Sequence, residues 1–368
     1  MNNEVYQKMP LTKRLDANLG YFCNNNCLFC YFMDRNKGSC NLDTGKAIKL
    51  FSFIRKLGID TLEITGGEAT LRDDILDLIL YAKKKLQFKK ISIITNGTRF
   101  SDERFAAQAV EAGVDDVLVS IHGHDAALHD RLAGRNGAFQ EVLKAVKNIK
   151  QLNISCRSNT VINSLNYKKS TEIAGLLHDL GIEKINYIFF SPLDDAIKAN
   201  HELWLRYSIA APFIKQMIED YGLKIKTISI KVIPFCQLEG YERYITDFFQ
   251  NIYDPYEWDY FNRVRVRRGA VIALSAALFG TLFLMPAKRV ASLSLRGSLY
   301  EGIMHTQASR ENTKGSLCKT CKFDLICPGV WKEYARIFGL KELKPVEGGK
   351  INDPDYYLRY RFSDYYKT

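Results

Sequence analysis

Three cysteines near the N-terminus stand at a spacing that could hold an inorganic group. Cys23, Cys27 and Cys30 form a C-x3-C-x2-C pattern on a short polar segment. Three thiolates are one too few to complete the ligand set of a structural zinc ion or of a 4Fe–4S cluster. We therefore expect one metal position to stay open, where a small molecule can bind. The alternatives are a partial zinc knuckle and a set of inert buried thiols.

This spacing resembles that of the radical S-adenosylmethionine (SAM) superfamily. The resemblance implies a 4Fe–4S cluster held by Cys23, Cys27 and Cys30, with the amino and carboxylate groups of SAM on the remaining iron. It also implies reductive cleavage of SAM to a 5′-deoxyadenosyl radical, which abstracts hydrogen from a substrate. Phe29 stands where the family has an aromatic residue near the adenine.

A pair of glycines and a carboxylate close the second predicted strand. They form the sequence Thr65-Gly66-Gly67-Glu68. Glycines let the backbone come close to a ligand, and the carbonyl groups together with the Glu68 carboxylate can bind a protonated amine. In the family that the chain resembles, a Gly-Gly-Glu sequence at this place contacts the amino group of SAM. We therefore expect these four residues to bind SAM.

Four further polar residues are predicted to contact SAM, namely Asn96, Ser120, Arg157 and Asn159. Asn96 follows the third predicted strand and Ser120 ends the fourth. The resemblance implies that both bind ribose, carboxylate or adenine edges, and that Arg157 pairs with the SAM carboxylate while Asn159 points to the same ligand. Two alternatives stay open, since Asn96 could belong to a turn and Arg157 could form a structural ion pair.

Three histidines follow the fourth predicted strand. His122, His124 and His129 lie close to Asp125 and Asp130 in the sequence. Such a group could bind substrate or relay a proton. It could equally be a solvated loop that leads into a helix, and we favour this second interpretation.

A second cysteine pattern lies near the C-terminus. Cys318, Cys321 and Cys327 have C-x2-C-x5-C spacing, which resembles the core of the SPASM or twitch extension of many radical SAM enzymes. The full SPASM pattern has seven cysteines and two clusters, but this chain has no cysteine after Cys327. Cys236 lies upstream, so four thiolates can hold one auxiliary 4Fe–4S cluster.

Alternatives to this ligand set remain. If Cys236 is not a ligand, the auxiliary cluster has an open iron that could bind substrate directly. Four thiolates could also hold a structural zinc ion, and the N-terminal motif is what favours iron and sulfide. The remaining cysteines, Cys40 and Cys156, are interpreted as ordinary thiols.

Short β-rich runs alternate with amphipathic helices over the first half of the chain. The predicted strands are Leu15–Tyr21, Thr61–Thr65, Ile91–Thr95, Asp116–Ile121, Ile154–Ile162 and Ile185–Phe190. The predicted helices are Asp43–Leu57, Asp73–Leu86, Ser101–Ala112, Ala138–Leu152 and Tyr167–Leu180. This order requires an α/β fold with a parallel sheet, and it agrees with the partial (β/α)6 TIM-like barrel of the radical SAM family. Ligands then lie at the carboxyl ends of the strands, where the first cysteine loop also falls.

After Pro192 the alternation stops, with a helix predicted at His201–Tyr221 and a strand at Leu223–Ile233. We expect a smaller C-terminal, cysteine-rich α+β domain that carries the auxiliary cluster. The expected division of the chain is a core barrel at 11–195, a connecting region at 196–317, a cluster segment at 318–340 to which Cys236 contributes, and a C-terminal tail at 341–368.

An apolar stretch of 18 residues, 269–286, interrupts the connecting region, with arginines before it and Lys288 and Arg289 after it. One helix of this length would measure about 27 Å, close to the thickness of a bilayer core. We favour burial between the barrel and the cluster domain. Contact with a membrane, spanning or interfacial, is the alternative.

Composition narrows the remaining choices. The chain has 368 residues, a formal net charge of +11 and nine cysteines at short spacings, with no apolar run of signal-peptide type at its start. These features favour metal-bound thiolates in the cytoplasm over a secreted disulfide framework. The basic charge suits an acidic peptide, an anionic membrane or nucleic acid, but the aromatic residues form no RNA-recognition motif, which makes nucleic acid an unlikely partner.

The sequence therefore predicts a radical SAM enzyme. Its expected partners are a peptide or small-molecule substrate and an electron donor such as flavodoxin or ferredoxin. Modification of a peptide or protein side chain is the first expectation, although the barrel begins too close to residue 1 for a leader-binding domain. A radical step in the biosynthesis of a small cofactor or metabolite is the alternative. A non-catalytic iron–sulfur or zinc scaffold is a further one, although it would have no use for SAM contacts.

Overall fold

The computed structural model describes residues 14–30, 41–191, 200–246, 260–285, 287–291, 295–351 and 356–357. The chain divides into two compact units. Asp16–Val232 form the first, here called the barrel unit, and Ile233–Thr368 with Met1–Leu15 form the second, the C-terminal unit.

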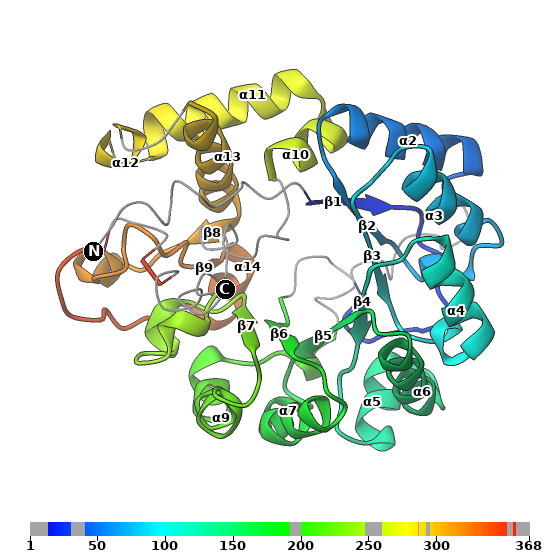
Figure 1. The fold of residues 1–368 in the computed structure, drawn as a ribbon. Coiled ribbons are helices and arrows are strands. Elements are labelled where there is room, and N and C mark those ends of the chain that lie inside the picture. Colours follow the sequence, from blue (N-terminus) through cyan, green and yellow to red (C-terminus); the bar gives the residue numbers. More distant parts are fainter. Residues whose placement is uncertain are drawn as a thin grey trace. The chain divides into compact units, whose positions relative to one another are not determined.

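A single sheet of seven strands is the framework of the barrel unit (Figure 1). The strands are β1 (Arg14–Asn18), β2 (Thr61–Thr65), β3 (Lys90–Thr95), β4 (Asp116–Ser120), β5 (Ser155–Ile162), β6 (Lys184–Phe189) and β7 (Thr227–Lys231). Their order in the sheet follows their order in the chain, and β2 to β7 pair in parallel. The predicted α/β partial barrel is confirmed.

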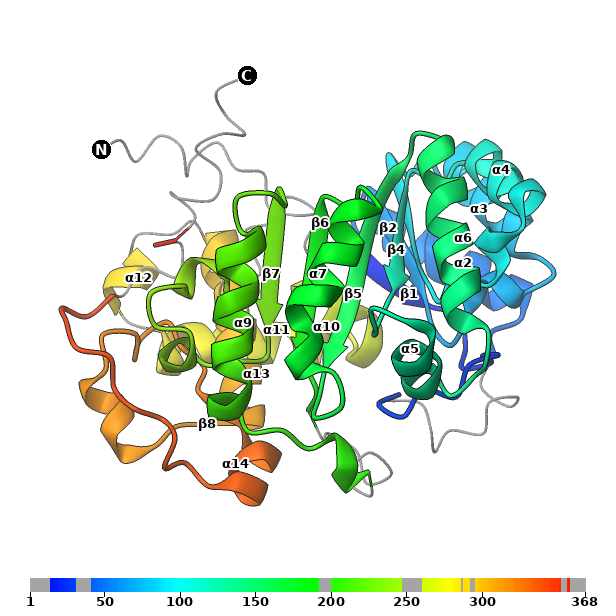
Figure 2. The ribbon, with the colours of Figure 1, turned by 90° about the horizontal axis from the view of Figure 1, so that it is seen from below.

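Helices cover the outer face of this sheet (Figure 2). They are α2 (Thr44–Lys56), α3 (Ile75–Lys84), α4 (Glu103–Ala112), α5 (Ala126–Ala133), α6 (Ala138–Gln151), α7 (Ser170–Asp179) and α9 (Tyr207–Tyr221). Phe51 of α2, Leu78 of α3 and Val117 of β4 are fully buried in the core between the two layers. Local signals set helix ends as expected, because the Asp43 carboxylate caps α2 by accepting a hydrogen bond from the Lys46 amide at 2.7 Å.

The barrel is one strand longer than the sequence predicted. The strand expected at Leu223–Ile233 is observed as β7, and it extends the sheet beyond β6 instead of standing outside the barrel. The helix α9 precedes it, so the βα alternation continues past Pro192. The boundary expected at residue 195 lies within residues 192–199, which are outside the described residues.

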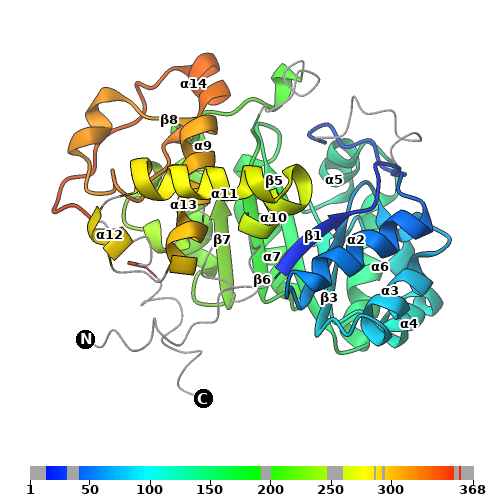
Figure 3. The same cartoon turned by 90° about the horizontal axis from the view of Figure 1, so that it is seen from above.

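The C-terminal unit is mostly helical in its described part (Figure 3). Its elements are α10 (Tyr260–Arg268), α11 (Ala270–Phe279), a π-helical turn (Gly280–Leu284), α12 (Ala287–Ala291), α13 (Leu295–Glu311), β8 (Asn312–Thr313), β9 (Val330–Trp331) and α14 (Lys332–Phe338). The helix α11 packs on α13, where Ala273 and Ala277 are buried with Ile303 and Met304. The antiparallel pair of β8 and β9 brackets the segment that carries the three C-terminal cysteines.

The apolar stretch does not form one continuous helix. The α-helical geometry of α11 ends at Phe279 and a π-helical turn follows. The side chains of Ala273 and Ala277 are buried, whereas those of Val271, Leu282 and Phe283 are exposed. The expected burial of the whole stretch is therefore wrong for its outer face. None of the helices in the described ranges has the length and apolar character that crossing a membrane requires.

Candidate active site

The loop with the first three cysteines follows β1 and is fastened to the end of α5. Cys23, Cys27 and Cys30 are partly exposed. The Asn26 amide donates to the Ala133 carbonyl at 3.0 Å, and the Leu28 amide donates to the Leu132 carbonyl at 3.1 Å. The backbone of the loop is thus held in place, and its three cysteines stay partly exposed.

Arg135, just after α5, makes the side-chain connections to this loop. Its Nε donates to the Asn25 Oδ1 at 2.6 Å, and its guanidinium also donates to the Thr98 hydroxyl at 2.9 Å. Glu141 forms an ion pair with the same guanidinium, and hydrogen bonding to this carboxylate raises the pKa of Arg135. The side-chain amide nitrogen of Asn24 donates to the same Thr98 hydroxyl at 2.9 Å. The Arg135 guanidinium therefore connects the cysteine loop to the two segments that carry Thr98 and Glu141.

Asn96 links the end of β3 to the first cysteine. Its Nδ2 donates to the Asn24 Oδ1 at 2.7 Å and lies 3.9 Å from the Cys23 sulfur, which also accepts from the Asn25 amide at 3.4 Å. The Asn96 side-chain oxygen accepts from the Thr98 amide at 3.0 Å, so the turn alternative is observed as well. Hydrogen bonds to a cluster-ligating sulfur stabilise the thiolate and help to set the reduction potential of a cluster.

The glycine pair after β2 has a packing role. A Cβ atom on Gly67 would lie 2.1 Å from the Phe22 carbonyl oxygen, and one on Gly66 would lie 2.5 Å from the Gly20 oxygen. The Gly67 amide donates to the Gly20 carbonyl at 2.9 Å, and the Glu68 amide donates to the Phe22 carbonyl at 2.7 Å. The two glycines therefore allow the start of the cysteine loop to lie directly against the backbone that follows β2.

The Glu68 carboxylate is buried and fully engaged within the chain. It accepts hydrogen bonds from the Thr95 hydroxyl at 2.8 Å, the Asn96 amide at 2.6 Å and the Thr70 hydroxyl at 2.5 Å. Burial raises the pKa of Glu68, while these hydrogen bonds act in the opposite direction. An open pocket lies beside it, lined in part by Thr65 and Gly67. Glu68 therefore holds the ends of β2 and β3 together.

Ser120 and Asn159 are direct neighbours in the sheet. The register of β4 and β5 pairs them, and Leu118 pairs with Arg157 two positions earlier. The register of β3 and β4 places Asn96, one residue past β3, level with Ser120. Three of the polar residues predicted from sequence thus lie in one row at the carboxyl ends of adjacent strands, as ligand-binding residues of parallel barrels do.

Arg157 lies deeper in the barrel and forms a buried ion-pair network. Its Nε donates to the Asp116 carboxylate at 2.8 Å, and a terminal nitrogen donates to the Glu63 carboxylate at 3.0 Å. Burial acts to raise the pKa of Asp116, but the charges of Arg157 and Lys90 outweigh it and hold this pKa well below its usual range. These contacts support the structural ion pair, not the expected pairing with a SAM carboxylate.

The histidines pack as part of the core. The rings of His122 and His129 are stacked with centroids 5.8 Å apart, and Phe29 meets His122 edge-on at 4.5 Å. The carboxylates have structural roles too, because Asp125 caps α5 at the Leu128 amide and Asp130 accepts from the Gly137 and Phe139 amides. The expected solvated loop is therefore wrong for His122 and His129, which are buried, whereas the expected helix start is observed at Asp125.

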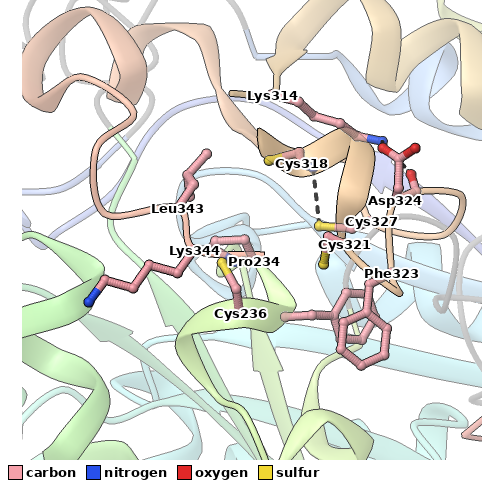
Figure 4. Close-up of a pocket in the computed structure, with 12 residues that line it drawn as sticks. Pro234, Cys236, Lys314, Cys318, Cys321, Phe323, Asp324, Cys327, Leu343 and Lys344 are labelled. Atoms are coloured by element: carbon pink, nitrogen blue, oxygen red, sulfur yellow. Dashed lines mark hydrogen bonds and ion pairs between the residues drawn. The ribbon is translucent and has the colours of Figure 1, made fainter. Parts of the chain in front are cut away.

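Four cysteines of the C-terminal unit line one small pocket. They are Cys236, Cys318, Cys321 and Cys327. The first lies on the single turn Phe235–Gln237 and the second on the turn Ser316–Thr320. Figure 4 shows the four sulfur atoms around this pocket, while the Lys344 side chain points away from it. The fold thus brings an upstream cysteine to the C-x2-C-x5-C segment.

Backbone amides approach two of these sulfurs. The Val346 amide donates to the Cys321 sulfur at 3.3 Å, and the Gly329 amide donates to the Cys327 sulfur at 3.4 Å. Such donors stabilise sulfur in its thiolate form, which is the form that binds metals. Within the described ranges, no three His, Cys, Asp or Glu side chains are close enough together to hold a single metal ion.

Burial favours the protonated form of three of these thiols in the absence of a positive group. It raises the pKa of Cys236 to about 12 and that of Cys327 to about 11, and it raises the pKa of Cys318 as well. Binding of a metal centre would deprotonate them and release protons, since the thiolate is the ligand.

Comparison with known proteins identifies a family for part of the barrel unit. Residues 17–177 match the model of the Radical SAM superfamily. This region is a radical SAM domain. Members of the superfamily bind SAM and a 4Fe–4S cluster and carry out radical chemistry. The family predicted from the cysteine spacing is therefore confirmed, whereas the resemblance of the C-terminal cysteines to SPASM or twitch domains stays a prediction.

Curated relatives of the radical SAM domain are named "Probable GTP 3′,8-cyclase". The protein from Saccharolobus solfataricus is 29% identical over 181 residues, which cover 49% of this chain and 57% of the relative. The protein from Methanococcus aeolicus is 32% identical over 191 residues, which cover 49% and 60%. The chain thus spans less than two thirds of the length of these relatives.

A solved structure extends the likeness to nearly the whole chain. It is described as native anSMEcpe with bound AdoMet and Cp18Cys peptide, and it matches with a TM-score of 0.54 at 14% identity. The match covers 95% of each chain. At this level of identity the likeness shows the fold.

Sequence reasoning missed the residues that position the cysteine loop of the radical SAM domain. Asn24 and Asn25 lie inside the motif and could have been noticed as polar side chains between ligands. Thr98 and Arg135 carry no local signal, because their link to the loop depends on how β3 and α5 are placed in the barrel.

Proposed function

We propose that this protein is a radical SAM enzyme that modifies a peptide or protein side chain, with Cys23, Cys27 and Cys30 as ligands of the catalytic 4Fe–4S cluster. The match to the radical SAM model and the partial exposure of the three cysteines on the fastened loop support this assignment. When bound, the cluster supplies one electron to the sulfonium of SAM, which gives methionine and a 5′-deoxyadenosyl radical that abstracts a hydrogen atom from substrate.

The proposed SAM site lies along the carboxyl ends of β2 to β5. We propose that Asn96, Ser120 and Asn159 contact SAM directly, since they lie in one row across three neighbouring strands. The backbone of Thr65-Gly66-Gly67 is the proposed acceptor for the SAM amino group. Glu68 acts there as a positioning residue, because its carboxylate already binds Thr70, Thr95 and Asn96. Phe29 stays the proposed aromatic neighbour of the adenine.

We propose an auxiliary 4Fe–4S cluster in the C-terminal unit. The observation that supports it most is that Cys236 lines the same cavity as Cys318, Cys321 and Cys327. Four thiolates close a cluster completely and leave no iron open to substrate. The proposed role of this cluster is therefore to accept an electron from the substrate radical, which loses a proton in the same oxidation.

A second candidate function is a radical step in the biosynthesis of a small cofactor. Curated relatives named "Probable GTP 3′,8-cyclase" match the domain at 29% and 32% identity. The peptide assignment is preferred because the structure with a bound peptide matches over 95% of both chains, whereas these relatives match over about half of this chain. We also propose a cytoplasmic location, and a flavodoxin or ferredoxin as the electron donor.

The first experiment measures iron, sulfide and 5′-deoxyadenosine after anaerobic reconstitution. With SAM and dithionite, we expect the wild type to form 5′-deoxyadenosine and a Cys23/Cys27/Cys30→Ala variant to form none. Absence of 5′-deoxyadenosine from a wild type that holds iron and sulfide would contradict the enzyme assignment and favour a non-catalytic scaffold.

The second experiment separates the two substrate classes by following the abstracted hydrogen. The enzyme is incubated with SAM and either a perdeuterated peptide library or ribose-deuterated GTP. Deuterium in 5′-deoxyadenosine is expected from the peptides and not from GTP. The reverse result would reject the peptide assignment in favour of the cofactor-biosynthesis candidate.

A further inference from the structure

A row of large apolar side chains is exposed along α11 and the π-helical turn that follows it. Val271 is 79% exposed, Leu282 70% and Phe283 72%. Ile272, Leu274, Leu278 and Phe279 belong to the same exposed set. We call these seven residues the apolar face. Contiguous apolar surface of this kind marks an interaction site in a folded protein.

The opposite face of the same segment is tightly fixed to α13. A Cβ atom on Gly280 would lie 1.6 Å from the Gly302 carbonyl oxygen, so the two backbones nearly touch. The Thr281 hydroxyl donates to the Ser298 carbonyl at 2.7 Å, and the Thr306 hydroxyl donates to the Ala276 carbonyl at 2.6 Å. These hydrogen bonds lie between the segment and α13, on the side opposite the apolar face.

The sequence around the apolar face is strongly basic. Residues 260–300 contain no Asp or Glu, and their seven cationic residues are Arg263, Arg265, Arg267, Arg268, Lys288, Arg289 and Arg296. Arg267 and Arg268 are exposed at the end of α10, directly before α11 begins. An apolar face with two exposed arginines directly before it is complementary to a surface that has an apolar interior and anionic groups outside it.

We propose that the apolar face binds the surface of an anionic lipid bilayer, with the exposed arginines on the headgroups. Helix α11 would lie parallel to the membrane surface, because α13 covers the side of α11 opposite the apolar face. Each arginine near an anionic surface adds attraction that salt weakens. A second copy of this chain fits less well, since pairing two such faces would bring like charges together.

Vesicle sedimentation tests this proposal on the full chain and needs no metal centre. We expect the protein to sediment with vesicles of equal parts phosphatidylcholine and phosphatidylglycerol, to bind pure phosphatidylcholine more weakly, and to be released by added salt. A Leu282→Ser/Phe283→Ser variant should bind at least about tenfold more weakly, because two exposed apolar anchors are removed. Leu223→Ser is the matched control, since Leu223 is 96% exposed outside this face.

A charge variant provides an independent measurement on the same vesicles. Arg267→Glu/Arg268→Glu should weaken binding to anionic vesicles and flatten its dependence on salt, while circular dichroism verifies the fold of each variant. Equal sedimentation of wild type and both variants would overturn the proposal. So would absence of binding to anionic vesicles together with a dimer in analytical ultracentrifugation that Leu282→Ser/Phe283→Ser dissociates, because a second copy would then cover the face.

Discussion

The Arg135 guanidinium lies 2.6 Å from the side-chain oxygen of Asn25, although 110 positions separate the two residues in the chain. This hydrogen bond joins the loop of the first three cysteines to the turn between α5 and α6. Since Thr98 and Glu141 bind the same guanidinium, one side chain holds three segments in register at the proposed cluster site.

Replacing Arg135 should therefore loosen the cysteine loop. We expect Arg135→Ala to lower the free energy of unfolding by about 1–2 kcal/mol, because three hydrogen-bonding partners lose their donor. Iron retention under a chelator should fall, and the reduction potential of the catalytic cluster should shift. Lysine keeps the charge but not the planar fork, so Arg135→Lys should restore only part of the loss.

The control for this prediction lies one turn earlier on α5. Arg131 pairs with Glu202 at 3.0 Å, and both side chains are about half exposed. Arg131→Ala should therefore change stability, iron retention and potential very little. Equal effects of the two alanine variants on iron retention would show that Arg135 has no particular role at the loop.

Local patterns in the sequence were sufficient for most of the barrel. Alternation of apolar residues located the strands, and Asp43 marked the start of α2 as expected. The seventh strand was found but misplaced, because the break in alternation after Pro192 was taken as the end of the barrel. No local pattern reports whether a later strand returns to the edge of a sheet.

The roles of individual site residues depended on partners that are distant in sequence. Arg157 was expected at SAM, yet Glu63 and Asp116 reach it from β2 and β4, and only the strand register reveals this. Glu68 was expected to bind a ligand with its carboxylate, which instead binds three residues of the chain. Composition likewise showed that 269–286 is apolar, but only the packing on α13 shows which face is covered.

The buried histidines should make the barrel unit less stable in mild acid. Burial lowers the pKa of His129 from 6.5 to about 4, and it lowers the pKa of His122 well below its usual value. Between pH 6.5 and about 4 the unfolded chain binds protons that the folded chain does not. The contribution of these histidines to the free energy of unfolding is therefore largest above pH 6.5. It falls with decreasing pH, by about 1.4 kcal/mol per pH unit for each histidine.

Urea unfolding at a series of pH values checks this slope. His129→Asn keeps an acceptor for the His122 amide and should flatten the slope by up to about one proton. His178, whose side chain is 43% exposed, is the control, and His178→Asn should leave the slope unchanged. A wild-type slope that is insensitive to His129→Asn would mean that this histidine titrates normally in the folded protein.

Removing one carboxylate from the buried ion-pair network inside the barrel should strongly lower the free energy of unfolding. Asp116→Asn removes one of the two carboxylates that hold the buried Arg157 guanidinium, and we expect a loss of about 3–5 kcal/mol in unfolding free energy. Glu172→Gln breaks an exposed pair with Lys169 on the surface and should cost less than about 1 kcal/mol. Urea titration of both variants at neutral pH makes the comparison, and similar losses would contradict a structural role for the network.

The auxiliary ligand set can be tested at Cys236, the only one of its four cysteines that lies outside the C-x2-C-x5-C segment. If Cys236 completes the set, Cys236→Ser should lower the iron content of the reconstituted chain from about eight towards four, or leave a cluster with one weakly held iron. Added imidazole or cyanide should then change the electron paramagnetic resonance spectrum of the reduced variant but not that of the wild-type auxiliary cluster. Cys156→Ser is the control, because Cys156 is buried on β5 and burial raises its pKa to about 12. Unchanged iron and spectra in Cys236→Ser would leave a three-cysteine cluster with an open iron, and direct binding of substrate to it would then replace electron transfer as its proposed role.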